Sequence, residues 1–206
     1  MEPKERIIQE AKTLFMKLGI RSVSMDDIAT HLGMSKKTIY QLFADKDELV
    51  DMVIESDIHQ LQKDCTLCSE IATDAIDEIF KTMEMIVWQF RNMNPMVLFD
   101  LQKFHHRSYE KFMVYKNRFL LEIISNNLTK GVTEELYRSD IKIEILSRYR
   151  LESLLIAFNL EVFPPDRFNI LEVTLEIIEH FLYGLSTEKG YQLIVQYKKK
   201  SIKNGL

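Results

Sequence analysis

Residues 24–43 read SMDDIATHLGMSKKTIYQLF, and this stretch decides the fold of the N-terminal part of the chain. Ser24 can cap a helix, and Asp27 three residues later completes a capping box, in which each side chain binds the other residue's backbone N–H. Gly33 ends that helix, because glycine tolerates the left-handed conformation that closes a helix and turns the chain. The apolar face of the helix consists of Ile28, Ala29 and Leu32. The stretch therefore opens with a short amphipathic helix and a tight turn.

A second helix follows the turn, with Ser35 as its cap and Phe43 as its end. At about 100° per residue, one side of this helix is apolar and the other is polar. The apolar side carries Ile39, Leu42 and Phe43, whereas the polar side carries Lys37, Tyr40 and Gln41. Basic, aromatic and amide side chains suit contacts with phosphates and base edges. The pattern predicts a helix-turn-helix whose second helix enters the DNA major groove.

Further helices frame this motif. Downstream, Asp45 and Glu48 form a second capping-box pattern at the start of a helix that we expect to run from Lys46 to about Cys65. Upstream, a helix that Gly19 stops has its apolar residues at helical spacing: Ile7, Ala11, Leu14, Phe15 and Leu18. The expected order is one helix, the helix-turn-helix, and a longer helix leading out.

In this order and in its residues, the chain resembles the tetracycline-repressor-like (TetR) family of bacterial transcription regulators. Members of that family typically carry Ile-Ala, a Gly-hydrophobic-Ser turn, Thr-hydrophobic-Tyr and then Phe-x-x-Lys-x-x-Leu. The corresponding residues here are Ile28-Ala29, Gly33-Met34-Ser35, Thr38-Ile39-Tyr40 and Phe43 to Leu49. The resemblance covers about the first quarter of the chain. It implies an all-α protein with an N-terminal three-helix head and a C-terminal helical bundle.

The candidate DNA contacts fall into two groups. The resemblance assigns phosphate contacts to Thr38, Tyr40 and Lys46. Ser24 and Ser35 lie near helix N-termini, which also favour anions. For the groove we expect Lys36, Lys37 and Gln41, with Lys37 reaching guanine and Gln41 reaching adenine. This expectation is local, because the net charge of the whole chain is −4 and bulk charge by itself argues weakly against a nucleic-acid partner.

Composition agrees with a helical, folded protein. Of the 206 residues, 46% are hydrophobic, six are Gly and four are Pro, and no alternating runs typical of strands occur. The N-terminus, MEPKERIIQEAK, lacks the apolar core of a signal peptide, and no apolar run is long enough to span a bilayer. We therefore expect a cytoplasmic bacterial protein associated with the nucleoid.

The remainder of the chain predicts six more helices. Thr73 is the expected cap of the first, and a long aromatic helix is expected from Ser108 to about Leu128, ending near Gly131. The last large helices, around 142–160 and 167–185, have more apolar surface than one buried side requires. They are either buried core or a homodimer interface, and the resemblance implies the interface. We expect a DNA-binding domain at residues 1–46 and a ligand-binding and dimerisation domain at 47–206.

A small-molecule effector is the expected regulator, because members of the resembled family bind one inside the C-terminal bundle. An apolar pocket with a few polar groups is the usual design of such a site. The residues that we expect to line it are Trp88, Phe104, His105, Tyr109, Phe112, Tyr149 and Phe158. This predicts a repressor that the effector releases from a near-palindromic operator.

Alternative regulation could come from a protein partner, or from redox or metal chemistry at Cys65 and Cys68. Two thiols in a Cys-x-x-Cys spacing at the end of a predicted helix are more often ordinary half-buried residues, and zinc would need a histidine such as His59, His105 or His106. No phosphate-cradling glycine loop or hydrolase motif occurs, so we expect no enzyme activity and no metal or other cofactor.

Overall fold

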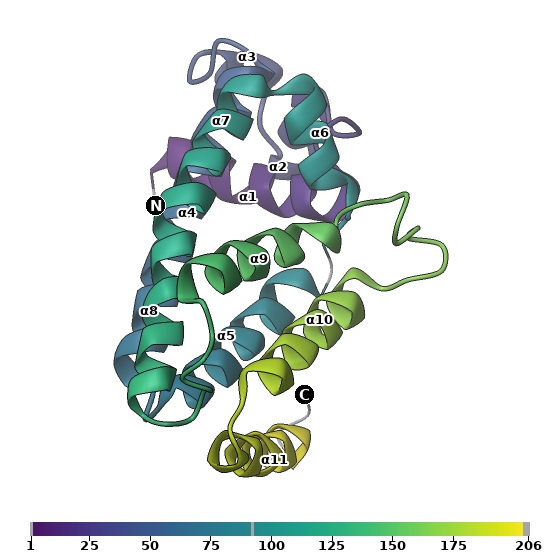
Figure 1. The fold of residues 1–206 in the computed structure, drawn as a ribbon. Coiled ribbons are helices and arrows are strands. Elements are labelled where there is room, and N and C mark those ends of the chain that lie inside the picture. The colour runs from purple at the N-terminus through teal and green to yellow at the C-terminus, as the bar shows by residue number, and fades with distance from the viewer. Residues whose placement is uncertain (1, 92, 204–206) are drawn as a thin grey trace. The chain divides into compact units, whose positions relative to one another are not determined.

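The structure is a computed structural model that describes residues 2–91 and 93–203, with side chains to residue 200. Helices dominate this part of the chain (Figure 1). The sole extended pairing within the described residues is an isolated bridge between Tyr137 and Ser186. The predicted all-α fold is confirmed. None of the described helices is both long and apolar enough to cross a membrane.

The chain forms two compact units, which we describe separately. The head unit comprises Met1–Leu61 with Asn92–Tyr115, and the bundle unit comprises Gln62–Arg91 with Lys116–Leu206. One helix, α4 (Lys46–Ile71), contributes residues to both units and ends six residues beyond the predicted Cys65.

The head unit contains the predicted succession of helices. These are α1 (Pro3–Leu18), α2 (Met25–Leu32), α3 (Lys36–Tyr40) and the start of α4. Ile7, Ala11, Phe15, Ile28 and Ile39 meet in one core with the side chains of Leu49 and Val53 from α4. The apolar positions identified by helical spacing therefore hold the three helices together, except Leu18, which is 47% exposed at the end of α1 and lies outside this core.

The helix α3 is shorter than predicted, because it ends at Tyr40 and not at Phe43. The backbone N–H groups of Leu42 and Phe43 both donate to the carbonyl oxygen of Ile39, at 2.9 and 3.0 Å. This tight turn buries the Phe43 ring in the head core, where it is 1% exposed. Phe43 is therefore buried, as its apolar spacing predicted, although α3 itself ends three residues before it.

Two later helices, α6 (Met96–Phe104) and α7 (His106–Tyr115), also belong to the head unit. Val97 and Leu101 on α6 are buried in the same core as α1 and α2. The backbone N–H of Asn94 donates to the carbonyl oxygen of Met16 at 2.6 Å, just before α6 begins. Segments about 80 residues apart in sequence therefore pack as one body.

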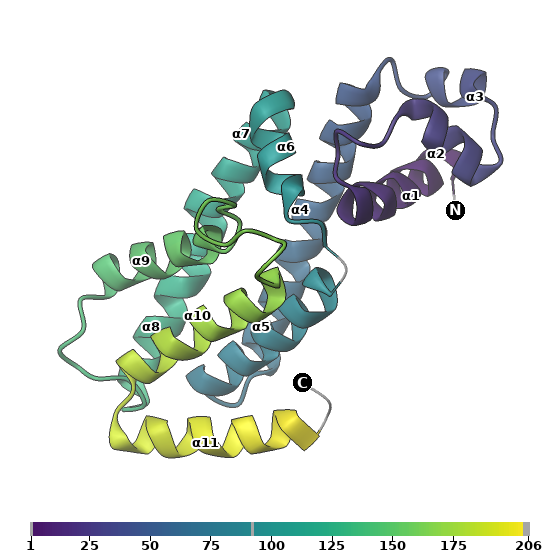
Figure 2. The same cartoon turned by 90° about the vertical axis from the view of Figure 1, so that its right-hand side faces the viewer.

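The bundle unit is built from α5 (Ala75–Phe90), α8 (Leu121–Thr133), α9 (Ile143–Ile156), α10 (Ile170–Leu185) and α11 (Glu188–Lys203). The helix α5 contacts α8, α10 and α11, and α8 packs along α9 (Figures 1 and 2). A buried cluster that includes Ile76, Leu128, Tyr137, Leu182 and Ile194 lies among these helices.

Two predicted details of the later helices differ in the structure for identifiable reasons. Asp74, and not Thr73, caps α5, because its Oδ1 accepts from the N–H groups of Ile76 and Asp77 at 2.9 and 2.8 Å. The expected single helix at 108–128 is α7, a π-helical turn at Lys116–Leu120 and then α8.

Gly131 does not end that helix, since it lies within α8. A Cβ atom at Gly131 would fall 2.0 Å from Cδ2 of Tyr137, so the glycine admits the tyrosine ring. Packing, and not chain reversal, therefore explains this glycine.

Candidate nucleic-acid interface and effector region

The turn between α2 and α3 has the predicted caps. Ser24 Oγ accepts from the backbone N–H of Asp27 at 3.1 Å, and the Ser24 N–H donates to Asp27 Oδ2 at 2.8 Å. The Ser24 hydroxyl, which donates to Asp27 Oδ2 at 2.6 Å, and the Ser24 backbone N–H together lower the pKa of Asp27, so the box is intact at neutral pH. Gly33 has φ of 63°, the left-handed conformation that the sequence required. Ser35 Oγ accepts from the Thr38 N–H at 3.1 Å and caps α3.

One side of α3 faces solvent and carries the predicted groove residues. Ile39 is fully buried, whereas Lys36, Lys37, Tyr40 and Gln41 are exposed. Lys37 and Gln41 lie one helical turn apart, which suits two neighbouring base contacts.

The side chains of Lys36 and Thr38 contact other residues of the head unit. Lys36 forms an ion pair with Asp26 on α2 at 2.7 Å, and this hydrogen bond raises the pKa of Lys36. Thr38 is half-buried, with its Oγ1 2.8 Å from Ser35 Oγ. No sequence motif identifies Asp26 as the partner of Lys36, because an acidic residue in the first turn of a helix is ordinary.

Lys46 points into the head unit in this conformation. Its Nζ donates to the carbonyl oxygen of Ile20 at 2.6 Å and lies 5.9 Å from the centre of the Phe15 ring. Burial lowers the pKa of Lys46. The side chain therefore ties α4 to the turn after α1, and a phosphate contact would require it to turn outward.

The predicted effector residues of the head unit lie on α7 and at the end of α6. The Nδ1 atom of His105 is 2.6 Å from Asp47 Oδ1 on α4. The Arg21 guanidinium lies 5.1 Å from the centre of the Phe104 ring. Tyr109 and Phe112 pack against the head core. His105 thus contacts α4 and Phe104 contacts the α1–α2 turn, whereas Tyr109 and Phe112 cover the head core.

A carboxylate that the sequence analysis did not identify lies beside them. Asp51 on α4 is buried and lies within 3.0 Å of Lys111 Nζ and 3.4 Å of Arg107 Nη2, both on α7. Ser108 Oγ donates to the same carboxylate at 3.3 Å. A single aspartate within an amphipathic helix carries no sequence signal for such a role.

The predicted effector residues of the bundle unit differ in their exposure and in their neighbours. Trp88 is 79% exposed on α5, and the Phe158 ring meets Phe90 edge-on at 5.5 Å. Tyr149 is exposed and its ring lies 6.0 Å from that of Phe181 on α10. Tyr149 and Phe181 line an open hollow of about 490 Å³ between α9 and α10.

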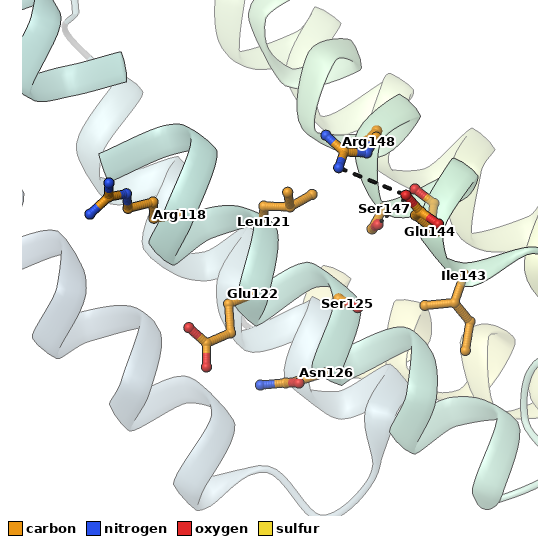
Figure 3. Close-up of a pocket in the computed structure, with 9 residues that line it drawn as sticks. All are labelled: Arg118, Leu121, Glu122, Ser125, Asn126, Ile143, Glu144, Ser147 and Arg148. Atoms are coloured by element: carbon orange, nitrogen blue, oxygen red, sulfur yellow. Dashed lines mark hydrogen bonds and ion pairs between the residues drawn. The ribbon is translucent and has the colours of Figure 1, made fainter. Parts of the chain in front are cut away.

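A second open hollow, of about 420 Å³, lies between α8 and α9 (Figure 3). Most of its lining residues have polar side chains, and Arg148 and Glu144 approach each other to 3.9 Å along α9. Arg118 and Glu122 come from the opposite wall. The predicted aromatic residues do not line this hollow.

The two cysteines lie within α4. Cys65 is buried and Cys68 is half-buried, and burial raises the pKa of the Cys68 thiol. A raised thiol pKa decreases the thiolate fraction that redox and metal chemistry need. Among the described residues, no group of three His, Cys, Asp or Glu side chains is placed to hold a metal ion.

The capped α2–turn–α3 unit, with basic and amide side chains outward, defines a helix-turn-helix DNA-binding protein. Residues 7–53 match the profile of bacterial regulatory proteins of the tetR family. The chain is 26% identical over 165 residues to an HTH-type transcriptional regulator of Staphylococcus aureus, covering 79% of this chain and 81% of that protein. The chain is thus similar to transcriptional regulators of the TetR family, most clearly over its helix-turn-helix region.

Other similar proteins agree with that placement. YvaF, an uncharacterized HTH-type transcriptional regulator of Bacillus subtilis, is 29% identical over 108 residues, which cover 50% of this chain and 54% of YvaF. The crystal structure of E. coli NemR in its reduced form has the same fold, with a TM-score of 0.72 and 13% identity over 90% of this chain and 98% of NemR. A transcriptional regulator from Saccharomonospora viridis in complex with choline has the same TM-score, identity and coverage.

Proposed function

We propose that this regulator is a homodimeric repressor that binds a near-palindromic operator and is released by a small effector. The carrying observation is the exposed side of α3, where Lys37, Tyr40 and Gln41 project from a helix that two caps and a buried Ile39 hold in place. Tyr40, Thr38 and Lys46 would contact phosphates, and Lys37 and Gln41 would contact base edges. In a dimer, two copies of α3 would enter successive major grooves about 34–36 Å apart.

The outer side of α9 supports the dimer. Ile145, Tyr149 and Ile156 recur at helical spacing and are 59%, 57% and 43% exposed. The neighbouring α10 uses Ile178, Leu182 and Leu185 for the core of its own unit. The apolar residues left over on α9, with the half-buried Leu171 and Leu175 of α10, form a stripe that a second copy would cover.

Release by an effector would act through α4 and its partners. Because Asp47 and Asp51 on α4 bind His105 and Lys111, a movement of α7 would displace the start of α4. The predicted effector residues Phe104, His105, Tyr109 and Phe112 belong to this region, and Trp88, Tyr149 and Phe158 to the bundle unit. The choline complex of the similar Saccharomonospora regulator supports a small-molecule effector. An effector changes operator affinity only if it binds the two states unequally.

Binding of the purified chain to the DNA upstream of its own gene tests the proposal. The assay uses near-physiological salt and excess non-specific competitor, followed by footprinting of the complex. We expect a protected, near-palindromic site, and loss of that site in a Lys37→Ala, Gln41→Ala double variant. A genome-wide selection of bound fragments that yields no site would refute specific DNA binding. A protein partner in place of the effector would be supported if operator release required a second protein.

A further inference from the structure

Four charged side chains are buried in the bundle unit, and three of them have a partner of opposite charge. Asp77 lies 3.4 Å from Lys81, Glu78 lies 3.6 Å from Lys130, and Lys116 lies 2.8 Å from Glu152. Such pairing is the rule, because an ion removed from water is unfavourable unless an opposite charge and hydrogen bonds replace its hydration.

The Oε2 atom of Glu78 lacks a hydrogen bond but has Lys130 nearby, whereas Arg150 on α9 has no partner of opposite charge among the described residues. Arg150 is 5% exposed, and its Nη1 atom is buried with no hydrogen-bond partner. Within the described chain, no carboxylate oxygen forms an ion pair with its guanidinium. The nearest recorded contact is the face of the Phe181 ring, whose centre is 5.4 Å from Cζ.

Arg150 stays charged at neutral pH. Burial lowers its pKa, but only to about 10. Its surroundings are apolar along α9 as well, because Leu146 and Leu154, one turn before and after it, are half-buried. The face of the Phe181 ring offsets part of the hydration that the guanidinium loses, but no hydrogen bond or opposite charge replaces the rest, so a structural role by itself does not explain Arg150.

We propose that Arg150 is the receptor for the anionic group of the effector, and that this effector is an amphipathic carboxylate. This inference rests on the proposed effector control and names the ligand's chemical class. Guanidinium binds carboxylate through two parallel hydrogen bonds, which would engage the Nη1 donor that is now without a partner. The tail would lie along the apolar side chains near Phe181.

The test uses the full chain and three probes that share one tail: octanoate, octanamide and octylammonium. Binding is measured by calorimetry, and thermal unfolding is followed in parallel. We expect octanoate to bind and to raise Tm, with much weaker effects of the neutral and cationic probes. Arg150→Met should weaken octanoate binding by at least about 30-fold, as expected for removing one partner of a buried charge pair. Arg150→Lys should retain part of the affinity.

The control is Arg148→Met, since Arg148 lies on the same helix but its side chain is 65% exposed. It should leave octanoate binding unchanged. Without ligand, Arg150→Met should unfold at the same or a higher temperature than the wild type, because an uncompensated charge is removed. No octanoate binding to the wild type, equal binding to Arg150→Met, or loss of the dimer in Arg150→Met would overturn the inference.

Operator binding measured in the same samples separates this inference from the proposed function. If octanoate binds at Arg150 without weakening the operator complex, the result would support an anion site at Arg150 and contradict a role of this site in effector control. Release of the operator by a neutral or cationic inducer, unaffected by Arg150→Met, would support effector control and overturn the assignment of a carboxylate.

Discussion

The carboxylate of Asp100 on α6 accepts a hydrogen bond from the backbone N–H of Arg21, with Oδ2 and N 2.9 Å apart across 79 residues of sequence. Asp100 is 3% exposed, and the bond lies at the turn that leads from α1 into α2. A backbone donor at the start of the helix-turn-helix is thus satisfied by a side chain from a helix outside it.

Removing this acceptor should destabilise the chain. We expect Asp100→Ala to lower the free energy of unfolding by about 1–3 kcal/mol, since the Arg21 N–H loses its partner. Asp100→Asn should lose less, because the amide oxygen can still accept. The midpoint of urea denaturation measures both variants, and equal values for Ala and Asn would contradict the hydrogen-bond account.

Lys46 should act both inside the head unit and on DNA. Lys46→Met removes the bond to the Ile20 carbonyl and should decrease stability by about 1 kcal/mol. If the ammonium turns outward to a phosphate, the slope of log affinity against log salt should also fall by about one. Lys17→Met on α1 serves as a control for a change of net charge. An unchanged slope in Lys46→Met would restrict the lysine to its internal role.

Tyr40 and Gln41 are neighbours with different expected effects. Tyr40→Phe removes a hydroxyl from a phosphate contact and should weaken binding to every DNA sequence alike. Gln41→Ala should instead relax the preference at one or two base positions, by about 1–3 kcal/mol of discrimination at each. Affinities for a set of single-base operator variants distinguish the two. A uniform loss with Gln41→Ala would refute its groove assignment.

The outer side of α9 should carry the dimer interface. Tyr149→Glu places a charge on a residue that is 57% exposed in the single chain, so it should yield folded monomers. Leu67→Glu, at a residue that is 53% exposed on α4, is the matched control and should remain dimeric. Light scattering with far-ultraviolet circular dichroism reads assembly and fold. A dimeric Tyr149→Glu protein would place the interface elsewhere.

Tyr197 should make the chain sensitive to alkali. Burial, aided by the 2.6 Å hydrogen bond to Asp74, raises the pKa of Tyr197 from 10 to about 12. The folded chain therefore holds this proton more tightly than the unfolded chain, so the resulting stability is present below pH 10 and is lost as the pH rises towards 12. The decline between these values should be shallower in Tyr197→Phe. Parallel curves for the two proteins would contradict the assignment.

The rules for helix caps and helical spacing predicted the head unit well, because the residues to which they apply lie close together in sequence. Ser24, Asp27, Gly33 and Ser35 have the predicted roles, as each cap joins groups three residues apart. The same rules placed the end of α3 three residues too late and misread the role of Gly131, where the Tyr137 ring from the segment after α8 decides the packing. The proposed DNA and effector residues remain predictions.

By itself the sequence determined the all-helical fold, the helix-turn-helix and the outward side of α3, since helical spacing and caps operate within one or two turns. The tertiary structure alone decided which apolar residues of α9 and α10 are core: Ile178 is 1% exposed and Tyr149 57%, although both fit the apolar pattern. It alone brought Asp100 to Arg21 and left Arg150 without a counter-ion. Burial and long-range pairing depend on how distant segments pack, and no local pattern encodes that.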